Sequence, residues 1–232
     1  MTEAKLNVKL LAHTPNPDLT TATAAHLCYA SSSIDDLVKK VDSAYAEKLL
    51  KRLIDEGHWS VLEHASFTFG IEGVSRALTH QLVRHRIASY SQQSQRYVNA
   101  KDFSYVIPPK VKNDKELVKK FEEFMDSASE LYGEFAEKVP KEDARFVLPN
   151  ATESKIIVTM NARSLYNFFE RRCCTRAQWE IRILANEMRK LVREAAPKLF
   201  ENADAICERL SYCPEGKTCG RYPLKEEVLG KK

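Results

Sequence analysis

Apolar side chains recur with helical spacing over an early part of the chain. From Asp35 to Glu56 they fall on one helical face, and Gly57 stands where such a helix would end. We therefore predict one helix over this stretch and another over Thr20–Tyr29. A short apolar segment, Leu6–Leu11, predicts a strand before both.

Later segments favour a mixture of strands and helices. Strands are expected at Ala65–Ile71, where aromatic residues alternate with smaller groups, and at the β-branched segment Lys155–Met160. Helices are predicted from the capping residue Ser75 to about Arg86, over Asp114–Lys138, in a short piece containing Arg145, over Asn161–Arg172 and over Ala177–Glu194. The hydroxyl-rich segment Ile87–Tyr97 is predicted to be a loop. This pattern indicates an α+β (mixed α/β) fold, as a single domain over residues 1–232.

The charge balance narrows the classes of function. The chain has 36 Lys and Arg against 32 Asp and Glu, a formal net charge of +4 at pH 7. Nucleic-acid-binding proteins usually carry a broader positive excess, so a local cationic pocket is the better expectation. No basic segment followed by a long apolar stretch begins the chain, and no run of about 18 apolar residues occurs. We therefore expect a cytoplasmic protein that does not insert into membranes.

Three cysteines mark a C-terminal tail from about residue 201. Cys207, Cys213 and Cys219 have the spacing C-x5-C-x5-C. Zinc sites prefer more closely spaced pairs and need a fourth ligand, so reduced thiols are expected and no metal site is assigned.

One segment has no acidic residue. The 29 residues from Gly73 to Lys101 contain no Asp or Glu but several Arg and His side chains. If a helix continues to Arg86, then Gln81, Arg84 and His85 share one face. Guanidinium groups with nearby hydroxyl and amide groups suit a phosphate. Three interpretations stay open at this point: arginines that pair with acids elsewhere, an RNA-binding surface, and a site for a small phosphorylated ligand.

The centre of this segment carries a family resemblance. Arg84-His85-Arg86, seven further residues and then Ser94, followed by Arg96-Tyr97, resembles the signature of the flavin-dependent thymidylate synthases. Further matching motifs occur in the family's order, from about Leu6 to about Phe200: His58 to His64, Arg145 to Pro149, Asn161 to Leu165, and Arg172 with Ala177 to Ile181.

The resemblance implies an activity and an assembly. It implies synthesis of dTMP from dUMP, with methylenetetrahydrofolate as one-carbon donor and FAD reduced by NADPH as hydride carrier, without a covalent enzyme–nucleotide intermediate. It also implies a central, largely antiparallel sheet flanked by helices, and a homotetramer whose active sites combine residues of neighbouring subunits. No nucleic acid, membrane or metal partner is implied.

The resemblance also assigns residues to ligands. FAD is expected to contact Ser60, Arg84, His85, Arg86, Gln92, Asn161, Arg163 and Asn167. Substrate is expected to contact Gln81, Arg84, Gln92, Gln93, Ser94, Gln95, Arg96, Arg145 and Arg172, with His58 near the folate and flavin rings. Arg172 is the expected catalytic residue, because a guanidinium beside the uracil N3 and O2 edge favours the anionic ring.

The residue types leave simpler roles open for three of these side chains. Asn161 can cap the helix that follows it, and Arg172 can complement the dipole at a helix end. Ser94 has no evident base and orienting partner, so substrate binding is expected rather than nucleophilic attack.

Overall fold

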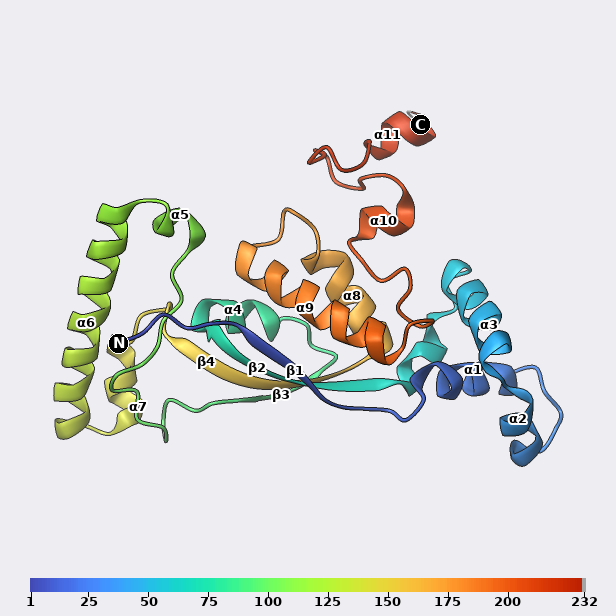
Figure 1. Ribbon diagram of the computed structural model, residues 1–232, viewed down its shortest axis with the longest axis horizontal. Coiled ribbons are helices and arrows are strands. Elements are labelled where there is room, and N and C mark those ends of the chain that lie inside the picture. Colours follow the sequence, from blue (N-terminus) through green and yellow to red (C-terminus); the bar gives the residue numbers. More distant parts are fainter. Residues whose placement is uncertain (231–232) are drawn as a thin grey trace. The chain divides into compact units, whose positions relative to one another are not determined.

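An antiparallel sheet and surrounding helices make up the structure, a computed structural model that describes residues 1–230. Within these residues four strands form one sheet in the order β1-β2-β4-β3. The strands are β1 Asn7–His13, β2 Ser66–Ser75, β3 Ser89–Gln92 and β4 Glu153–Asn161 (Figure 1). The predicted α+β class with a largely antiparallel sheet is confirmed.

The helices of the described chain are mostly short. They are α1 Pro17–Leu27, α2 Ile34–Lys40, α3 Ser43–Asp55, η1 Trp59–His64, α4 Arg76–Leu82, α5 Pro109–Lys112, α6 Lys115–Lys138, α7 Lys141–Ala144, η2 Arg145–Val147, α8 Ala162–Arg172, α9 Trp179–Ala195, α10 Ile206–Leu210 and α11 Lys225–Leu229, where η denotes a 3₁₀ helix. No helix within residues 1–230 is long and apolar enough to cross a membrane.

The chain forms two compact units. Unit 1 consists of Met1–Val8, Gly70–Arg84 and Tyr90–Val158, and unit 2 consists of Lys9–Phe69, His85–Ser89 and the chain from Thr159 onward. Each unit is thus assembled from separate parts of the sequence. This division does not test the prediction of one domain over residues 1–232, which stays a prediction.

Unit 1 has a core beside its longest helix. Phe103, Tyr105 and Ile107 form a buried cluster with Met125 and Ala128 of α6. Asp114 caps α6 by accepting hydrogen bonds from the backbone N–H groups of the first turn, and α6 is the helix predicted over Asp114–Lys138.

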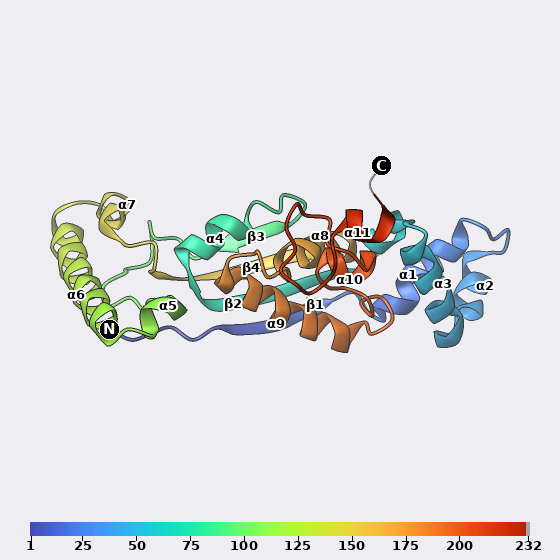
Figure 2. The same cartoon turned by 90° about the horizontal axis from the view of Figure 1, so that it is seen from above.

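The core of unit 2 is aromatic. The Phe200 ring lies 5.2 Å from that of Phe67 in β2 and 5.7 Å from that of Tyr166 in α8, measured between ring centroids. The Tyr166 hydroxyl donates a hydrogen bond of 2.8 Å to the Leu199 carbonyl, which satisfies the buried polar end of this ring. Helix α8 packs against α9, and α1 packs against α3 (Figure 2).

Three predicted elements differ from the structure. The predicted single helix over Asp35–Glu56 is wrong, because the chain becomes extended at Val41 and Asp42 between α2 and α3. The Asp42 carboxylate accepts a hydrogen bond from the Tyr45 backbone N–H at 2.8 Å, so a cap begins a second helix there. Gly57 does follow the end of α3, with φ of 79°.

The helix from Ser75 is shorter than predicted. Ser75 caps α4 through the Leu78 N–H, as expected, but the helix ends at Leu82 rather than near Arg86. The predicted loop over Ile87–Tyr97 includes β3, which lies at one edge of the sheet. Pairing with β4 gives the backbone of β3 its hydrogen-bond partners, although its side chains are rich in hydroxyl groups.

Candidate active site

In unit 1, Gln92 is held by two hydroxyl groups. Its amide nitrogen donates hydrogen bonds to Thr79 Oγ1 of α4 at 3.0 Å and to Ser154 Oγ of β4 at 2.8 Å. These two bonds use both amide hydrogens and fix the side chain. The amide oxygen of Gln92 is then the atom suited to accept a hydrogen bond from a ligand.

The residues after β3 line a cavity in unit 1. The backbone N–H of Gln93 donates to the Lys155 carbonyl at 2.9 Å, and Ser94 Oγ accepts from the Arg96 backbone N–H at 3.2 Å. Gln93, Ser94 and Gln95 line a cavity of about 240 Å³ together with residues of β4. Three of the predicted nucleotide-binding residues therefore share one cavity.

Arg96 and Arg145 meet at one acidic residue. Arg96 Nε donates to the Glu142 carboxylate at 2.8 Å, and Arg145 Nε donates to the Glu142 backbone carbonyl at 3.0 Å. The hydrogen bond with the Glu142 carboxylate raises the pKa of Arg96 above its usual range. Sequence reasoning missed Glu142, although its position three residues before Arg145 in a predicted helical piece was a usable signal.

Arg76 is a further basic residue that sequence reasoning did not assign. Its Nη1 atom is buried and has no hydrogen-bond partner within residues 1–230. Burial, and then the positive charge of Arg145, lower the pKa of Arg76. A buried guanidinium nitrogen without an acceptor, close to a second cation, suits an anionic ligand group. In the sequence, the position of Arg76 within the segment 73–101, which has no acidic residue, could have indicated this role.

In unit 2, Arg172 and His85 are hydrogen-bonded. Arg172 is the last residue of α8, and its Nε donates a hydrogen bond of 3.0 Å to His85 Nε2. The His85 ring packs edge-on against the Phe168 ring, with 5.0 Å between the ring centroids. Because Nε2 accepts, the imidazole is neutral and carries its proton on Nδ1. Asn167 also hydrogen-bonds the His85 side chain. The structure thus brings together three predicted site residues.

The charge state of His85 follows from its surroundings. Burial is the main cause that lowers the pKa of His85 to about 4, and the charges of Arg172 and Arg171 lower it further. Between the ordinary pKa of 6.5 and a pKa of about 4, the unfolded chain binds a proton at His85 and the folded chain does not. The free energy of unfolding should therefore fall as the pH is lowered through this range.

A His85→Gln variant should lose this part of the pH dependence. Denaturant unfolding at pH values from 7 down to 4 measures it, with the exposed residue His64 changed to Gln as the matched control. Above about pH 6.5 His85 is neutral in both states and contributes no pH dependence. An unchanged slope in the His85 variant would contradict the assignment.

Three other predicted residues, Asn161, Arg163 and His58, have partners within unit 2. Asn161 Oδ1 accepts from the Ser164 N–H at 2.8 Å, so it caps α8, and Arg163 Nη1 pairs with Glu63 at 2.5 Å. Nε2 of His58, the residue before η1, lies 3.5 Å from Oε2 of Glu56. Ser60, Arg84, Arg86 and Asn167 are exposed. Ligand contacts of these residues stay predictions.

The shared helical face predicted for Gln81, Arg84 and His85 is wrong. Helix α4 ends at Leu82, so only Gln81 lies on it. In the described part of the chain, no three His, Cys, Asp or Glu side chains are placed to hold a metal ion.

An α+β fold that presents arginine, amide and hydroxyl groups beside a sheet defines a protein suited to phosphorylated ligands. The chain matches the family model described as thymidylate synthase complementing protein over residues 9–198. A flavin-dependent thymidylate synthase of Geobacter sulfurreducens is 54% identical over 220 residues, covering 93% of this chain and 94% of that protein. Another, from Nitratidesulfovibrio vulgaris, is 48% identical over 244 residues, covering 98% of this chain and all (100%) of that protein.

A solved structure shares the fold. It is the UMP/dUMP methylase PolB from Streptomyces cacaoi bound with 5-Br dUMP, with a TM-score of 0.77 at 23% identity over 86% of this chain and 95% of that one. The chain belongs to the family of flavin-dependent thymidylate synthases and is a methyltransferase. The resemblance predicted from the motifs is confirmed.

Proposed function

We propose that this enzyme makes dTMP from dUMP by reductive methylation. Methylenetetrahydrofolate is the one-carbon donor, and FAD reduced by NADPH is the hydride carrier. The observation that carries the proposal is the 54% identity, over 93% of the chain, to a protein named flavin-dependent thymidylate synthase. The structural neighbour that binds 5-Br dUMP agrees with a pyrimidine nucleotide as substrate.

The nucleotide is proposed to bind through residues of unit 1. Arg96 and Arg145, which meet at Glu142, supply cationic donors for the phosphate, and Arg76 adds a buried one. The remaining proposed contacts, taken from the family resemblance, are Gln81, Arg84, Gln92, Gln93, Ser94, Gln95 and Arg172. Of the three interpretations of the acid-free segment, family membership favours the small phosphorylated ligand.

The donor set fits a flavin dinucleotide. Arg86 and Arg163 present exposed guanidinium groups in unit 2, which suit a pyrophosphate, and Ser60 and Asn167 present exposed polar groups. His85, Asn161, Arg84 and Gln92 complete the proposed FAD contacts, and His58 is proposed near the folate and flavin rings. When bound and reduced, FAD supplies hydride.

Arg172 is proposed to act electrostatically on the uracil ring. An arginine does not act as a base at neutral pH, but its guanidinium favours negative charge on the ring and so makes C5 more nucleophilic. The neutral His85 ring accepts from Arg172 Nε and orients the guanidinium. Because the His85 ring is neutral, it does not cancel the positive charge of Arg172, and the electrostatic effect on the uracil ring requires that charge.

The proposed scheme has no covalent bond between enzyme and nucleotide. Ser94 Oγ accepts a hydrogen bond from the Arg96 N–H in its own turn, which suits a binding role. We expect Ser94→Ala to weaken dUMP binding about 10-fold, the loss of one hydrogen bond to a charged group, with little change in kcat. Flavin absorbance titrated with dUMP measures the affinity, with Ser91→Ala, an exposed serine of β3, as control. A trapped Ser94 adduct during turnover would overturn the scheme.

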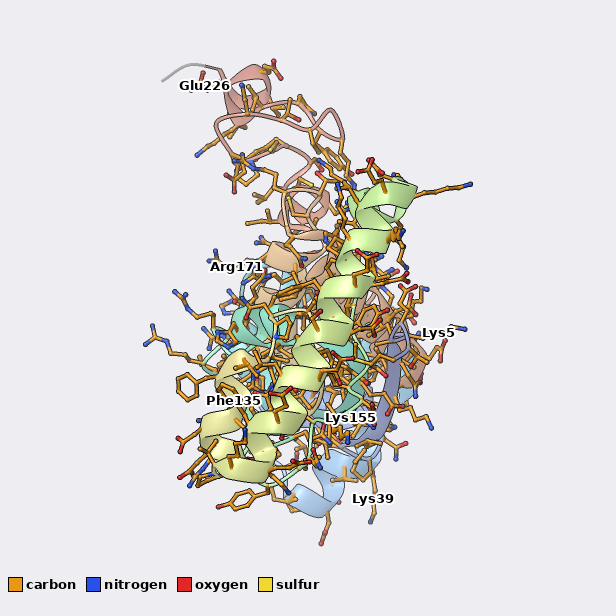
Figure 3. The ribbon with its side chains drawn as sticks, turned by 90° about the vertical axis from the view of Figure 1, so that its left-hand side faces the viewer. Lys5, Lys39, Phe135, Lys155, Arg171 and Glu226 are labelled. Atoms are coloured by element: carbon orange, nitrogen blue, oxygen red, sulfur yellow. The ribbon has the colours of Figure 1, made fainter. Side chains whose placement is uncertain are left out.

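A homotetramer with shared active sites is also proposed. Leu117, Phe124, Leu131 and Phe135 recur along α6 and are exposed, Phe124 by 58%. Figure 3 shows α6 with Phe135 labelled. Positions seven and four residues apart lie on one face of a helix, so this apolar stripe suits contact with another subunit. We further propose that the chain acts as one domain and works in the cytoplasm.

The absorption spectrum of the purified enzyme tests cofactor and substrate together. A flavin spectrum that changes when dUMP is added, and dTMP formed when methylenetetrahydrofolate and NADPH are supplied, are the expected results. A protein that binds no added FAD contradicts the proposal. Salt-sensitive RNA binding without flavin binding would instead favour the RNA interpretation.

A further inference from the structure

The C-terminal tail lies beyond the residues that match the family model, which end at 198. None of residues 211–230 is buried. Polar contacts hold this segment: Arg176 donates to Glu215 at 3.3 Å, Tyr222 donates to Glu208 at 2.8 Å, and the Cys213 N–H donates to the Pro223 carbonyl at 2.7 Å. Since apolar burial is the main stabilising term in folding, a segment in which some residues are half-buried but none is fully buried stands to gain from a cross-link.

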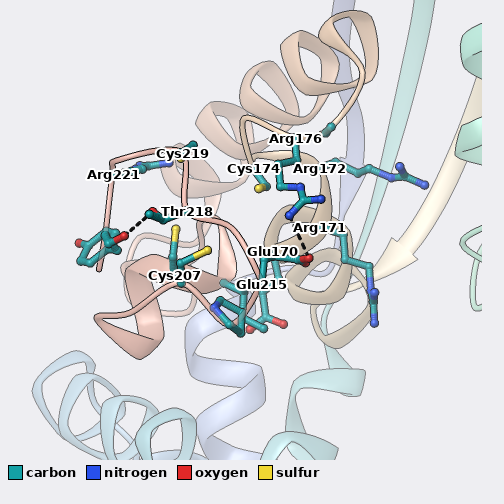
Figure 4. Close-up of a pocket in the computed structure, with 15 residues that line it drawn as sticks. Glu170, Arg171, Arg172, Cys174, Arg176, Cys207, Glu215, Thr218, Cys219 and Arg221 are labelled. Atoms are coloured by element: carbon teal, nitrogen blue, oxygen red, sulfur yellow. Dashed lines mark hydrogen bonds and ion pairs between the residues drawn. The ribbon is translucent and has the colours of Figure 1, made fainter. Parts of the chain in front are cut away.

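Four cysteines line one cavity beside this tail. The cavity, of about 280 Å³ in unit 2, is lined by Cys174 from the linker after α8 and by Cys207, Cys213 and Cys219 from the tail (Figure 4). All six cysteines of the chain are unbridged. No three metal-binding side chains in residues 1–230 are close enough to share an ion, whereas a disulfide needs only two thiols.

Two of these cysteines line the cavity with different exposure, since Cys174 is half-buried. Cys219 is exposed, and its sulfur is hydrogen-bonded by the side chain of Thr175, the residue directly after Cys174. This hydrogen bond, and then one with the Arg221 backbone, lower the pKa of Cys219. The thiolate is the form that reacts with oxidants, and Cys219 is the exposed one of the four cavity cysteines, so we expect it to react first among these four.

We propose that Cys219 and Cys174 form a reversible disulfide when the protein meets a peroxide. The Cys219 thiolate attacks one oxygen of hydrogen peroxide, so an S–O bond forms, the O–O bond breaks and the second oxygen leaves as water after taking a proton. The Cys174 sulfur then attacks the Cys219 sulfenic acid, the S–S bond forms, and the S–O bond breaks with release of a second water. Two thiols and one peroxide thus give one disulfide and two waters, and a dithiol reverses the reaction.

The bond would change the chain next to a proposed catalytic residue. Cys174 is two residues after Arg172, whose side chain points away from Cys207 and Cys219 in Figure 4. A link to the tail would constrain the linker between α8 and α9. Slower, dithiothreitol-reversible turnover is therefore expected on oxidation, and this consequence alone rests on the proposed function.

Tryptic mass spectrometry of the full chain after hydrogen peroxide treatment tests the bond directly. Cleavage gives the peptides 173–176, CCTR, and 218–221, TCGR, which should appear joined and should separate after dithiothreitol. Cys173 shares the first peptide but is buried, so the joined pair should persist in Cys173→Ser and vanish in Cys174→Ser. Cys28→Ser, which removes an exposed thiol outside the cavity, is the matched control and should leave the joined pair unchanged.

Several results would overturn the proposal. If a different pair of peptides is joined, or if Cys28 is oxidised as fast as Cys219, the disulfide between Cys219 and Cys174 is contradicted. Stoichiometric zinc that is lost in Cys174→Ser would make the cavity a metal site instead. Because the joined peptides are observed without any assay of dTMP, failure of the proposed function leaves this test intact.

Discussion

Arg172→Ala will lower the rate of dTMP formation by about 10²- to 10³-fold, the usual cost of removing one group that stabilises developing negative charge. FAD will stay bound, because the proposed flavin contacts do not include this side chain. The loss will appear in kcat as well as in kcat/KM, since the guanidinium is proposed to act on the anionic ring rather than on the substrate as it binds. Steady-state kinetics with the flavin content measured in parallel checks both parts.

Two further variants separate the role of Arg172 from general effects of charge. Arg171→Ala removes the adjacent, exposed arginine and should leave turnover within about two-fold, because a screened surface charge contributes little. Arg172→Lys keeps the charge but loses the planar fork that donates to His85, so it should recover only part of the rate. Near-normal turnover in Arg172→Ala would remove the residue from the mechanism.

Gly73→Ala will have the largest effect on folding. Gly73 has φ of 72°, and a Cβ there would lie 1.9 Å from the backbone carbonyl oxygen of Lys5, also in unit 1. The left-handed backbone alone costs about 1 kcal/mol or more for alanine, and backbone atoms cannot turn aside as a flexible side chain can. We expect a loss of more than about 4 kcal/mol in the free energy of unfolding, measured by urea denaturation, or failure to fold.

Gly57→Ala is the matched control for this prediction. Gly57 has φ of 79°, and a Cβ there would meet nothing within 4 Å. The variant carries the left-handed strain without the clash, so a loss of about 1 kcal/mol is expected. Equal losses in the two variants would show that the close approach to Lys5 contributes nothing.

Local patterns were sufficient for most elements of the fold. The cap at Ser75 acts as predicted, and Asn161 makes the cap that its residue type left open, because a capping bond is made within one helical turn. Local patterns failed where two signals competed. The apolar periodicity over 35–56 favoured one helix, although Asp42 caps a second helix there. The polar side chains of β3 favoured a loop, although the backbone of β3 pairs with β4, which is distant in sequence.

The sequence likewise predicted some features of the candidate site and not others. Residue types and ordered motifs pointed to the arginines and to the family. The comparisons confirm the family, and the roles of the arginines stay predictions. The partners Glu142, Thr79 and Ser154 could not be assigned from spacing to Arg96 and Gln92, because these contacts join residues 13 to 62 positions apart. The cavity that holds Cys174 with the tail cysteines was equally hidden.

By itself, the sequence determined the fold class, the family and the residue types able to meet a phosphate and a flavin. Those properties follow from periodicity, capping and ordered motifs, which depend on residues close together in the sequence. Only the tertiary structure decided that His85 accepts from Arg172 and is neutral, and that Arg76 has a buried nitrogen with no acceptor among residues 1–230. Burial and long-range hydrogen bonds set charge states, and both exist only when distant segments pack together.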